Sequence, residues 1–359
     1  QQWITQLGDE DFQTREAADR NLYEAGEVAL PALRVAAQSA TEFEVRDRAN
    51  RTFDRIADEL QAAALAFFRE RGAEVDPKIL NLNGEAFTDD DMVRVARVKT
   101  ATRVRLVGSL VTDEGLKHLG RMENLEILRL DKTKVTDAGI AHLQGLTKLQ
   151  GLTLNECAIS DVGVAHISKI RSLRSVSLGR IQITDDALKH LALLPKLRGL
   201  SVNGTNIGNG NFQHLRPLRT RLEALSAYDT QLSDEDLRSL TEFNLLKGIT
   251  ISRTDVTDKG IMHLEKLPKL ERLGLDGTKV TDACLTPLTR FSVLAHLSLM
   301  GTEVTPTGLE SLAKISTLRT VHVPDSLTEA QTFNLQKAVD ENRTGPKRIL
   351  IVWRRYTEN

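Results

Sequence analysis

The sequence has few aromatic residues, little net charge and no long apolar run, and each shortage excludes a class of protein. Phe, Trp and Tyr together make up 4% of its 359 residues, which argues against a sugar-binding surface built on ring stacking. No apolar stretch reaches the roughly 18 residues that a membrane-spanning helix requires. We therefore expect a soluble protein that inserts into no membrane.

The charge balance and the absence of catalytic motifs exclude further classes of function. The 48 Lys and Arg residues are balanced by 49 Asp and Glu residues, so the overall field favours neither nucleic acid nor an anionic membrane as a partner. The sequence has no Gly-rich phosphate loop after a strand and no nucleophile elbow. These absences predict a protein that is not an enzyme and that carries no cofactor.

The first residue is Gln1 rather than Met, and no signal peptide follows it. We interpret the chain as a processed or trimmed product. Its compartment is not evident from the sequence, and export after removal of an N-terminal signal is one expectation.

A block of about 24 residues recurs along most of the chain, and its clearest copy is LEILRLDKTKVTDAGIAHLQGLTK from Leu125 to Lys148. The blocks, numbered here as repeats 1 to 11, start at Pro77, Ala101, Leu125, Leu149, Leu173, Leu197, Leu222, Leu246, Leu270, Leu294 and Leu318. Only repeat 6 is one residue longer. A fixed period of this length predicts a solenoid whose repeats bury their apolar side against their neighbours.

Within each repeat, places are counted from the first residue. Leu-x-x-Leu-x-Leu at places 1 to 6 alternates as a short strand does. Thr and Asp at places 12 and 13 predict the start of a helix of about two turns, because the hydroxyl caps the helix and the carboxylate suits its positive end. Gly at place 15 indicates a contact between successive repeats. The pattern predicts a parallel sheet inside and short helices outside.

The repeat resembles the cysteine-containing and ribonuclease-inhibitor-like leucine-rich repeats, and is closest to the Thr-x-Val-Thr-Asp-x-Gly-Leu kind abundant in bacterial, especially planctomycete, proteins. The resemblance implies an α/β fold, a right-handed leucine-rich-repeat horseshoe over residues 77–323. It also implies a non-enzymatic interaction scaffold for a protein or peptide, and we expect a monomer. Related repeats form substrate-recognition arms of ubiquitin-ligase adaptors and of bacterial effectors, so that function is an alternative.

The two ends of the chain depart from the repeat. Residues 1–76 predict helices over Asp11–Ala25, Glu27–Ala40 and from Glu42 towards Gly72, and the pair VALPALRVAA and EVRDRANRTFDRI resembles a HEAT-like repeat. Residues 324–359 predict a helix over Thr328–Asp340, a break at Gly345 and Pro346, and a strand over Arg348–Trp353 followed by two arginines. Both ends are expected to cap the solenoid.

Places 3 and 5 of the strands should form the concave face. In the middle repeats they hold Gly, Ser, Thr and Ala, and larger residues return towards both ends. Small residues either leave a groove for a partner or let the strands crowd on the inside of the curve, and both interpretations stay open. Our candidates for partner binding are Arg103, Arg105, Arg129 and Asp131 at one end, Arg272, His296 and Met300 at the other, and Tyr228 between them.

Place 18 holds six of the eight histidines: His118, His142, His166, His190, His214 and His263. Stacked imidazoles could share metal ions, so a metal-binding or sensing protein is a second alternative. The competing interpretation is structural, because no carboxylate or thiol recurs beside these histidines. Cys157 and Cys284 lie five repeats apart, about 25 Å at 4.8 Å per strand, too far for a disulfide. We expect both to be small buried packing residues.

Overall fold

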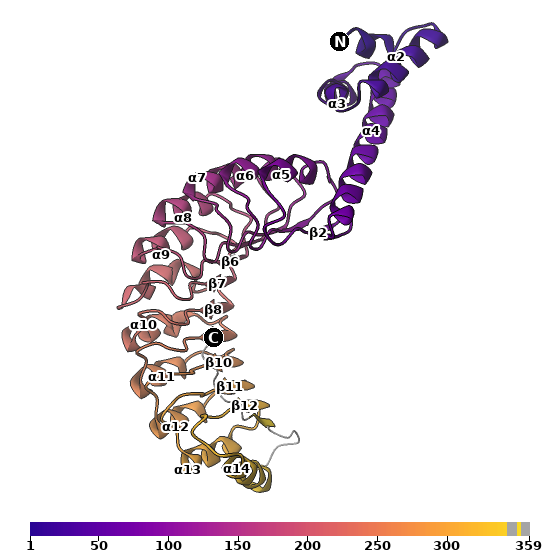
Figure 1. Ribbon diagram of the computed structural model, residues 1–359. Coiled ribbons are helices and arrows are strands. Elements are labelled where there is room, and N and C mark those ends of the chain that lie inside the picture. The colour runs from indigo at the N-terminus through magenta and orange to yellow at the C-terminus, as the bar shows by residue number, and fades with distance from the viewer. Residues whose placement is uncertain (343–349, 353–359) are drawn as a thin grey trace.

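The computed structural model describes residues 1–342 and 350–352. Its strands form one sheet that bends into an arch, with the strands on the inner side and most helices on the outer side (Figure 1). The 13 strands lie in sequence order, and every neighbouring pair is parallel except β1 with β2. This arrangement confirms the predicted solenoid of parallel strands and outer helices.

Most strands are three residues long and occupy places 3 to 5. They are β1 (Glu74–Val75), β2 (Ile79–Asn81), β3 (Arg103–Arg105), β4 (Ile127–Arg129), β5 (Gly151–Thr153), β6 (Ser175–Ser177), β7 (Gly199–Ser201), β8 (Ala224–Ser226), β9 (Gly248–Thr250), β10 (Arg272–Gly274), β11 (His296–Ser298), β12 (Thr320–His322) and β13 (Leu350–Val352). From β2 to β12, equivalent places of successive repeats stand opposite each other, as Arg105 does with Arg129.

The outer elements begin at place 13 in most repeats. They are α5 (Asp89–Val95), α6 (Asp113–Leu119), α7 (Asp137–Ile140), η2 (Ala141–Leu143), α8 (Asp161–Ile167), α9 (Asp185–Leu191), η3 (Asn211–Leu218), α10 (Asp234–Ser239), η4 (Leu240–Glu242), α11 (Asp258–Leu264), η5 (Asp282–Cys284), α12 (Leu285–Leu288), α13 (Pro306–Leu309) and η6 (Glu310–Lys314), where η denotes a 3₁₀ helix. The predicted two-turn helices are therefore partly replaced by the tighter 3₁₀ form.

One continuous apolar core runs through the arch from Ala64 to Ile351. The middle residue of each repeat strand points into it, and so do the apolar residues at places 16 and 19, such as Leu116 and Leu119. Cys157 and Cys284 are also buried in this core as free thiols. The structure thus confirms the packing role expected for both cysteines.

The carboxylate at place 13 joins one repeat to the next. Asp113 accepts hydrogen bonds from the Thr136 backbone N–H at 2.8 Å and from the Thr136 hydroxyl at 2.6 Å. The next repeat follows the same pattern, because Asp137 accepts from the N–H and the hydroxyl of Ser160. A Cβ added to Gly139 would collide with the Asp113 carboxylate. The predicted role of Asp was to favour its own helix, whereas its side chain instead bridges to the following repeat.

We call this contact between successive repeats the Asp bridge. Along repeats 1 to 9 it is missing once. Every repeat from 1 to 5 and from 7 to 9 uses its place-13 Asp to accept the place-12 backbone N–H of the next repeat, but repeat 6 has Asn209 at place 13. Here the Asn209 N–H donates to the Gln231 carbonyl at 3.0 Å. The Phe212 N–H of repeat 6 donates to the Asp236 carboxylate of repeat 7, also at 3.0 Å, so that here the later repeat supplies the carboxylate. The longer repeat 6 therefore divides the Asp bridges into two series.

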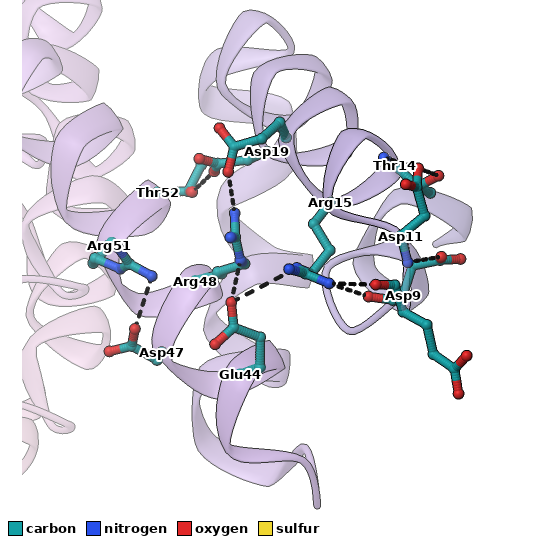
Figure 2. Close-up of polar contacts among 12 residues, drawn as sticks. Asp9, Asp11, Thr14, Arg15, Asp19, Glu44, Asp47, Arg48, Arg51 and Thr52 are labelled. Carbon is teal, nitrogen blue, oxygen red and sulfur yellow. Dashed lines mark hydrogen bonds and ion pairs between the residues drawn. The ribbon is translucent and has the colours of Figure 1, made fainter.

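The N-terminal helices are α1 (Gln2–Gln6), α2 (Phe12–Glu24), η1 (Gly26–Ala29), α3 (Leu30–Ser39) and α4 (Phe43–Glu70). Residues between Leu7 and Ile56 form their own apolar core, separate from that of the solenoid. Arg15 and Arg48 point between α2 and α4 towards Glu44 (Figure 2). On α2, Ala18 and Leu22 are buried in this core, whereas Phe12 is 55% exposed.

The lid on the first repeat comes from the last part of α4. Ala64, Leu65 and Phe68 belong to the solenoid core rather than to the helical core. Arg71 follows α4 and pairs with the nearly buried carboxylate of Asp91 at 2.6 Å, while its guanidinium lies over the ring of Phe87 at 5.2 Å. The capping contact is therefore made by a short segment around residues 64–75, and α4 continues into it as the sequence predicted.

At the other end, α14 (Glu329–Asn342) and β13 follow the last repeat, and β13 pairs in parallel with β12. Gly345, Pro346, Arg348 and Trp353, together with the two arginines after it, lie outside the described residues. None of the described helices is long and apolar enough to cross a membrane.

Candidate binding surface on the concave face

The alternation of each strand sorts its residues between core and concave face. In β3, Val104 is fully buried, whereas Arg103 is exposed and Arg105 is half-buried. β4 repeats the pattern with Leu128 inside and Arg129 exposed. Places 3 and 5 therefore line the inner side of the arch, as the sequence predicted.

A shallow hollow of about 340 Å³ lies in the middle of this face. It spans β6 to β10, and the residues around it are Ser175, Val176, Ser177, Gly199, Leu200, Ser201, Ala224, Leu225, Ser226, Gly248, Thr250 and Arg272. Its exposed lining consists of glycines, hydroxyls and one alanine, with one arginine at the edge. The sequence predicted small residues at places 3 and 5 of the middle strands. These places of β5 to β9, called the floor below, lie for the most part in this hollow.

Packing does not require glycine in this floor. A Cβ added to Gly151 would lie 3.6 Å from its nearest neighbour, one added to Gly199 3.4 Å, and one added to Gly248 3.9 Å. These are ordinary van der Waals distances, whereas the same addition at Gly139 or Gly163 on the outer side would collide with a carboxylate. Crowding of the strands therefore does not account for these three glycines.

A row of polar side chains at place 7 borders the floor. Asp131 accepts from the Thr153 hydroxyl at 2.6 Å and from the Asn155 N–H at 2.9 Å. Asn155 in turn accepts from the Ser177 hydroxyl at 2.8 Å, and Asn203 does so from Ser226 at 2.7 Å. Asp131 is thereby engaged with the next repeat.

The three N-terminal arginines stand together. Arg105 is directly opposite Arg129 on the adjacent strand, and Arg103 is two residues from Arg105 on the same side of β3. None of the three makes an ion pair or a side-chain hydrogen bond with the rest of the described chain. At the other end, Arg272 is opposite the exposed His296.

Tyr228 and Met300 lie beside the floor rather than on it. Both occupy place 7, in the turns after β8 and β11, and their backbone N–H groups donate to Asn203 and Asp276 at 2.9 Å. The guanidinium of Arg253 lies 5.5 Å from the Tyr228 ring centroid. These two candidates therefore border the concave face at the edge that carries the place-7 row.

The histidines of place 18 lie on the outer side, one in each of repeats 2 to 6 and one in repeat 8. His166 shares a hydrogen bond of 2.8 Å with the Gln144 side chain, and His142 is exposed. Nowhere in residues 1–342 and 350–352 do three His, Cys, Asp or Glu side chains form a group suited to a metal ion. The structural interpretation of these histidines is the one that the His166 contact supports.

A feature missed by sequence reasoning is the left-handed turn at place 8. Charged residues adopt positive φ there in five repeats, namely Lys132, Glu156, Arg180, Asp229 and Arg253. Other repeats have Gly at the same place, such as Gly84, Gly108 and Gly277, also with positive φ. The glycines at place 8 were the sequence signal from which this turn could have been predicted. Glu156 lies 3.7 Å from Lys132 and 3.8 Å from Arg180, so charges alternate along this border.

A second depression of about 290 Å³ separates the N-terminal helices from the first repeats. Arg34, Phe53, Lys99, Arg121 and Glu123 are among its lining residues. Partial desolvation, together with repulsion from Arg34, lowers the pKa of the Lys99 ammonium. Arg34 pairs with Glu123 at 3.1 Å, so the depression is a polar junction between the two parts of the molecule.

No family model and no curated protein matches the chain. Among solved structures, an internalin from Listeria monocytogenes is 18% identical and aligns over 84% of this chain and 91% of its own, with a TM-score of 0.50. The mouse RP105/MD-1 complex is 16% identical over 74% of this chain and 45% of that one, with a TM-score of 0.51. Identities this low bear on the fold alone. Together with the repeat geometry they show that the chain is a leucine-rich-repeat solenoid.

Proposed function

We propose that this protein is a non-enzymatic scaffold that binds a polypeptide on its concave face. The observation that carries the proposal is the floor over β5 to β9, where glycines occur at positions that would accept a Cβ. Because packing leaves room for a Cβ at these places, the glycines are better explained by a partner that lies on the floor. A partner backbone approaches most closely where side chains are absent.

The chemistry of the floor supports binding rather than catalysis. The side chains around the hollow are mainly hydroxyls, with the Arg272 guanidinium at its edge. These groups donate and accept hydrogen bonds, and none of them pairs a nucleophile with a base. Polar contacts of this kind suit a polypeptide, whose backbone offers both donors and acceptors.

The likeness to known structures supports the same proposal at the level of fold. The mouse RP105/MD-1 structure is a complex of two proteins, as its name says. An open solenoid with a long ordered surface is an architecture used widely for binding proteins. We propose that this chain acts as a monomer towards a protein or peptide. No observation among the described residues favours the metal-binding or the ubiquitin-ligase alternative.

A bulky side chain in the floor tests the proposal. Ser201→Trp places an indole in the hollow, and Val162→Trp places the same group on the outer surface, where Val162 is 60% exposed. Partners captured from the source organism are identified by mass spectrometry, purified and titrated against each variant. We expect Ser201→Trp to abolish binding with little change in melting temperature, and Val162→Trp to bind normally. The opposite pattern would move the binding surface to the outer side.

The arginine cluster provides a second test of the same surface. The double change Arg105→Glu and Arg129→Glu should abolish capture of the partner and leave the melting temperature nearly unchanged, because neither arginine makes an ion pair or a side-chain hydrogen bond within the described residues. Unchanged capture would exclude this end of the concave face and direct attention to Arg272, His296 and Met300.

A further inference from the structure

The charges on the concave strands have one sign. On β2 to β12, the charged residues at places 3 and 5 are Arg103, Arg105, Arg129 and Arg272, whereas no Asp or Glu occupies either place. The whole chain has a formal net charge of −1. This inner lane is therefore locally basic in a molecule that is nearly neutral overall, and a partner of opposite charge is favoured there.

The arginines form two groups with the small floor between them. Arg103, Arg105 and Arg129 lie on β3 and β4, Arg272 lies on β10, and the five strands β5 to β9 separate them. The four guanidinium groups make no ion pair or side-chain hydrogen bond within residues 1–342 and 350–352. Each remains available for bidentate contact with a carboxylate.

Most carboxylates at the borders of the sheet already take part in hydrogen bonds or ion pairs. Asp131 and Asp276 accept hydrogen bonds from the following repeats. Glu223 forms ion pairs with Arg198 and Lys247, which occupy place 2 of the two neighbouring repeats, and the Lys247 ammonium is 2.8 Å away. Glu126 and Glu271 precede β4 and β10 and reduce the local charge without pairing with the four arginines. The cluster on β3 and β4 therefore keeps the larger positive charge and is the stronger anchor.

The distance between the groups sets the length of the ligand. β4 and β10 are six steps apart, and at about 4.8 Å per step they are separated by roughly 29 Å along the stack. An extended polypeptide covers this distance with about nine residues at 3.3 Å each. The floor between the groups offers no large apolar side chain against which a helix could bury an apolar face.

We propose that the partner segment is an extended acidic polypeptide with two acidic ends about nine residues apart. Its stronger acidic end contacts Arg103, Arg105 and Arg129, its small central residues cross β5 to β9, and its second acidic group reaches Arg272. This inference rests on the proposed function of the concave face and specifies the partner's chemistry. The two anchors act together through effective concentration, which is greatest when the spacer matches the span.

The probes are fluorescein-labelled synthetic peptides with three glutamates at each end and Gly-Ser spacers of about 4, 9 and 14 residues, lengths that bracket the span. Fluorescence anisotropy at low ionic strength measures their affinity for the full-length protein. We expect the middle spacer to bind about tenfold more tightly than the short one, and its affinity to fall as salt is raised. A single-stranded oligonucleotide of equal charge should bind more weakly than this peptide.

Charge variants test which group of arginines binds each acidic end of the peptide. Arg272→Glu should remove the advantage of the middle spacer and leave the short peptide's affinity unchanged, whereas Arg105→Glu with Arg129→Glu should abolish binding of both. The control Lys196→Glu with Lys266→Glu changes the net charge equally at exposed residues away from the concave strands and should bind as the wild type does. Circular dichroism verifies that each variant is folded.

Equal affinity at every spacer length, equal binding of the oligonucleotide, or full binding by the arginine variants would overturn this inference. The proposed function is judged separately by Ser201→Trp with the natural partner. If Ser201→Trp blocks that partner while the acidic peptides fail, the concave face remains the binding surface and only the acidic partner is wrong. If both tests fail, both proposals fall.

Discussion

Single residues at places 12, 13 and 15 account for the regular stacking of the repeats. A place-13 carboxylate such as Asp113 accepts two hydrogen bonds from the Thr136 backbone and hydroxyl of the following repeat, and hydrogen bonds to a charged group contribute about 1.5 to 3 kcal/mol. Where place 15 is glycine, as at Gly139, the missing Cβ leaves room for this carboxylate. Recurrence of the three residues therefore sets the distance between repeats.

Gly139 and Gly145 provide a matched pair of substitutions. A Cβ at Gly139 would meet the Asp113 carboxylate and lie 3.0 Å from Leu116, whereas one at Gly145 would meet nothing within 4 Å. We expect Gly139→Ala to lower the free energy of unfolding by about 1 to 3 kcal/mol, the usual effect of overpacking. Gly145→Ala should leave it unchanged or raise it by up to about 1 kcal/mol. Urea titrations measure both, and equal effects would contradict the contact assigned to place 15.

The positive φ of charged residues at place 8 leads to an unusual expectation for Arg180. Its φ is 54°, a conformation that costs most side-chain-bearing residues about 1 to 2 kcal/mol. Arg180→Gly removes this strain together with an exposed ion pair of little energetic value, so stability should stay the same or rise by about 0.5 to 1 kcal/mol. Thermal denaturation checks this. A loss of more than about 1 kcal/mol would show that the Arg180 side chain supports the fold.

At the scale of single residues, the sequence predicted the contacts that follow from the repeat period, and it missed side-chain contacts between one repeat and the next. The burial of Cys157, the place-15 contact and the position of Arg105 beside Arg129 follow from periodicity alone, because equivalent places must stack. The bridge from Asp113 to Thr136 was missed because a carboxylate next to a helix cap has a sufficient local role. The contacts of Asp131 were missed for a similar reason, since its partners Thr153 and Asn155 belong to the next repeat.

At the scale of elements, the N-terminal part combines a separate helical core with a short cap. Residues 64–75 cover the first repeat, whereas the helices before them pack mainly on each other. The sequence predicted α4 through to Gly72 but not the change of partner within it, because its apolar stripe is continuous. Which core each turn joins depends on the tertiary arrangement.

Two truncations separate these roles. Removal of residues 1–60 should leave a folded, monomeric solenoid, because Leu65 and Phe68 still cover the end of the core. Removal of residues 1–76 should destabilise it by several kcal/mol, since burying each of these large side chains contributes about 1.5 to 3 kcal/mol, and should promote aggregation. Size-exclusion chromatography and melting curves compare the two proteins. Identical behaviour would place the cap elsewhere.

The irregular repeat 6 predicts that the two halves of the stack unfold separately. Cys157 and Cys284 lie on either side of the missing Asp bridge, and burial raises the pKa of both thiols, that of Cys284 to about 12. Each thiol should therefore react with a thiol reagent at pH 8 only after its half opens. We expect labelling of Cys157 and Cys284 to occur at different urea concentrations. Coincident labelling would indicate a single cooperative unit.

At the scale of the whole molecule, the sequence predicted the architecture because one period runs through most of the chain. Curvature, the parallel sheet and the outer helices all follow from repeating one unit. The hollow over β6 to β10 was anticipated as a small floor, but the choice between a groove and crowded strands depended on distances around Gly199 and Gly248. Those distances come only from the folded arrangement of neighbouring repeats.

Site-specific photo-crosslinking tests most directly whether the concave face binds a polypeptide. A photoreactive amino acid is introduced at Ser201 in the floor or at Val162 on the outer surface, and adducts formed in extracts of the source organism are sequenced by mass spectrometry. We predict a defined peptide adduct from position 201 that unlabelled protein competes away, and none from position 162. A specific adduct from position 162, with none from position 201, would contradict the assignment of the concave face as the binding surface.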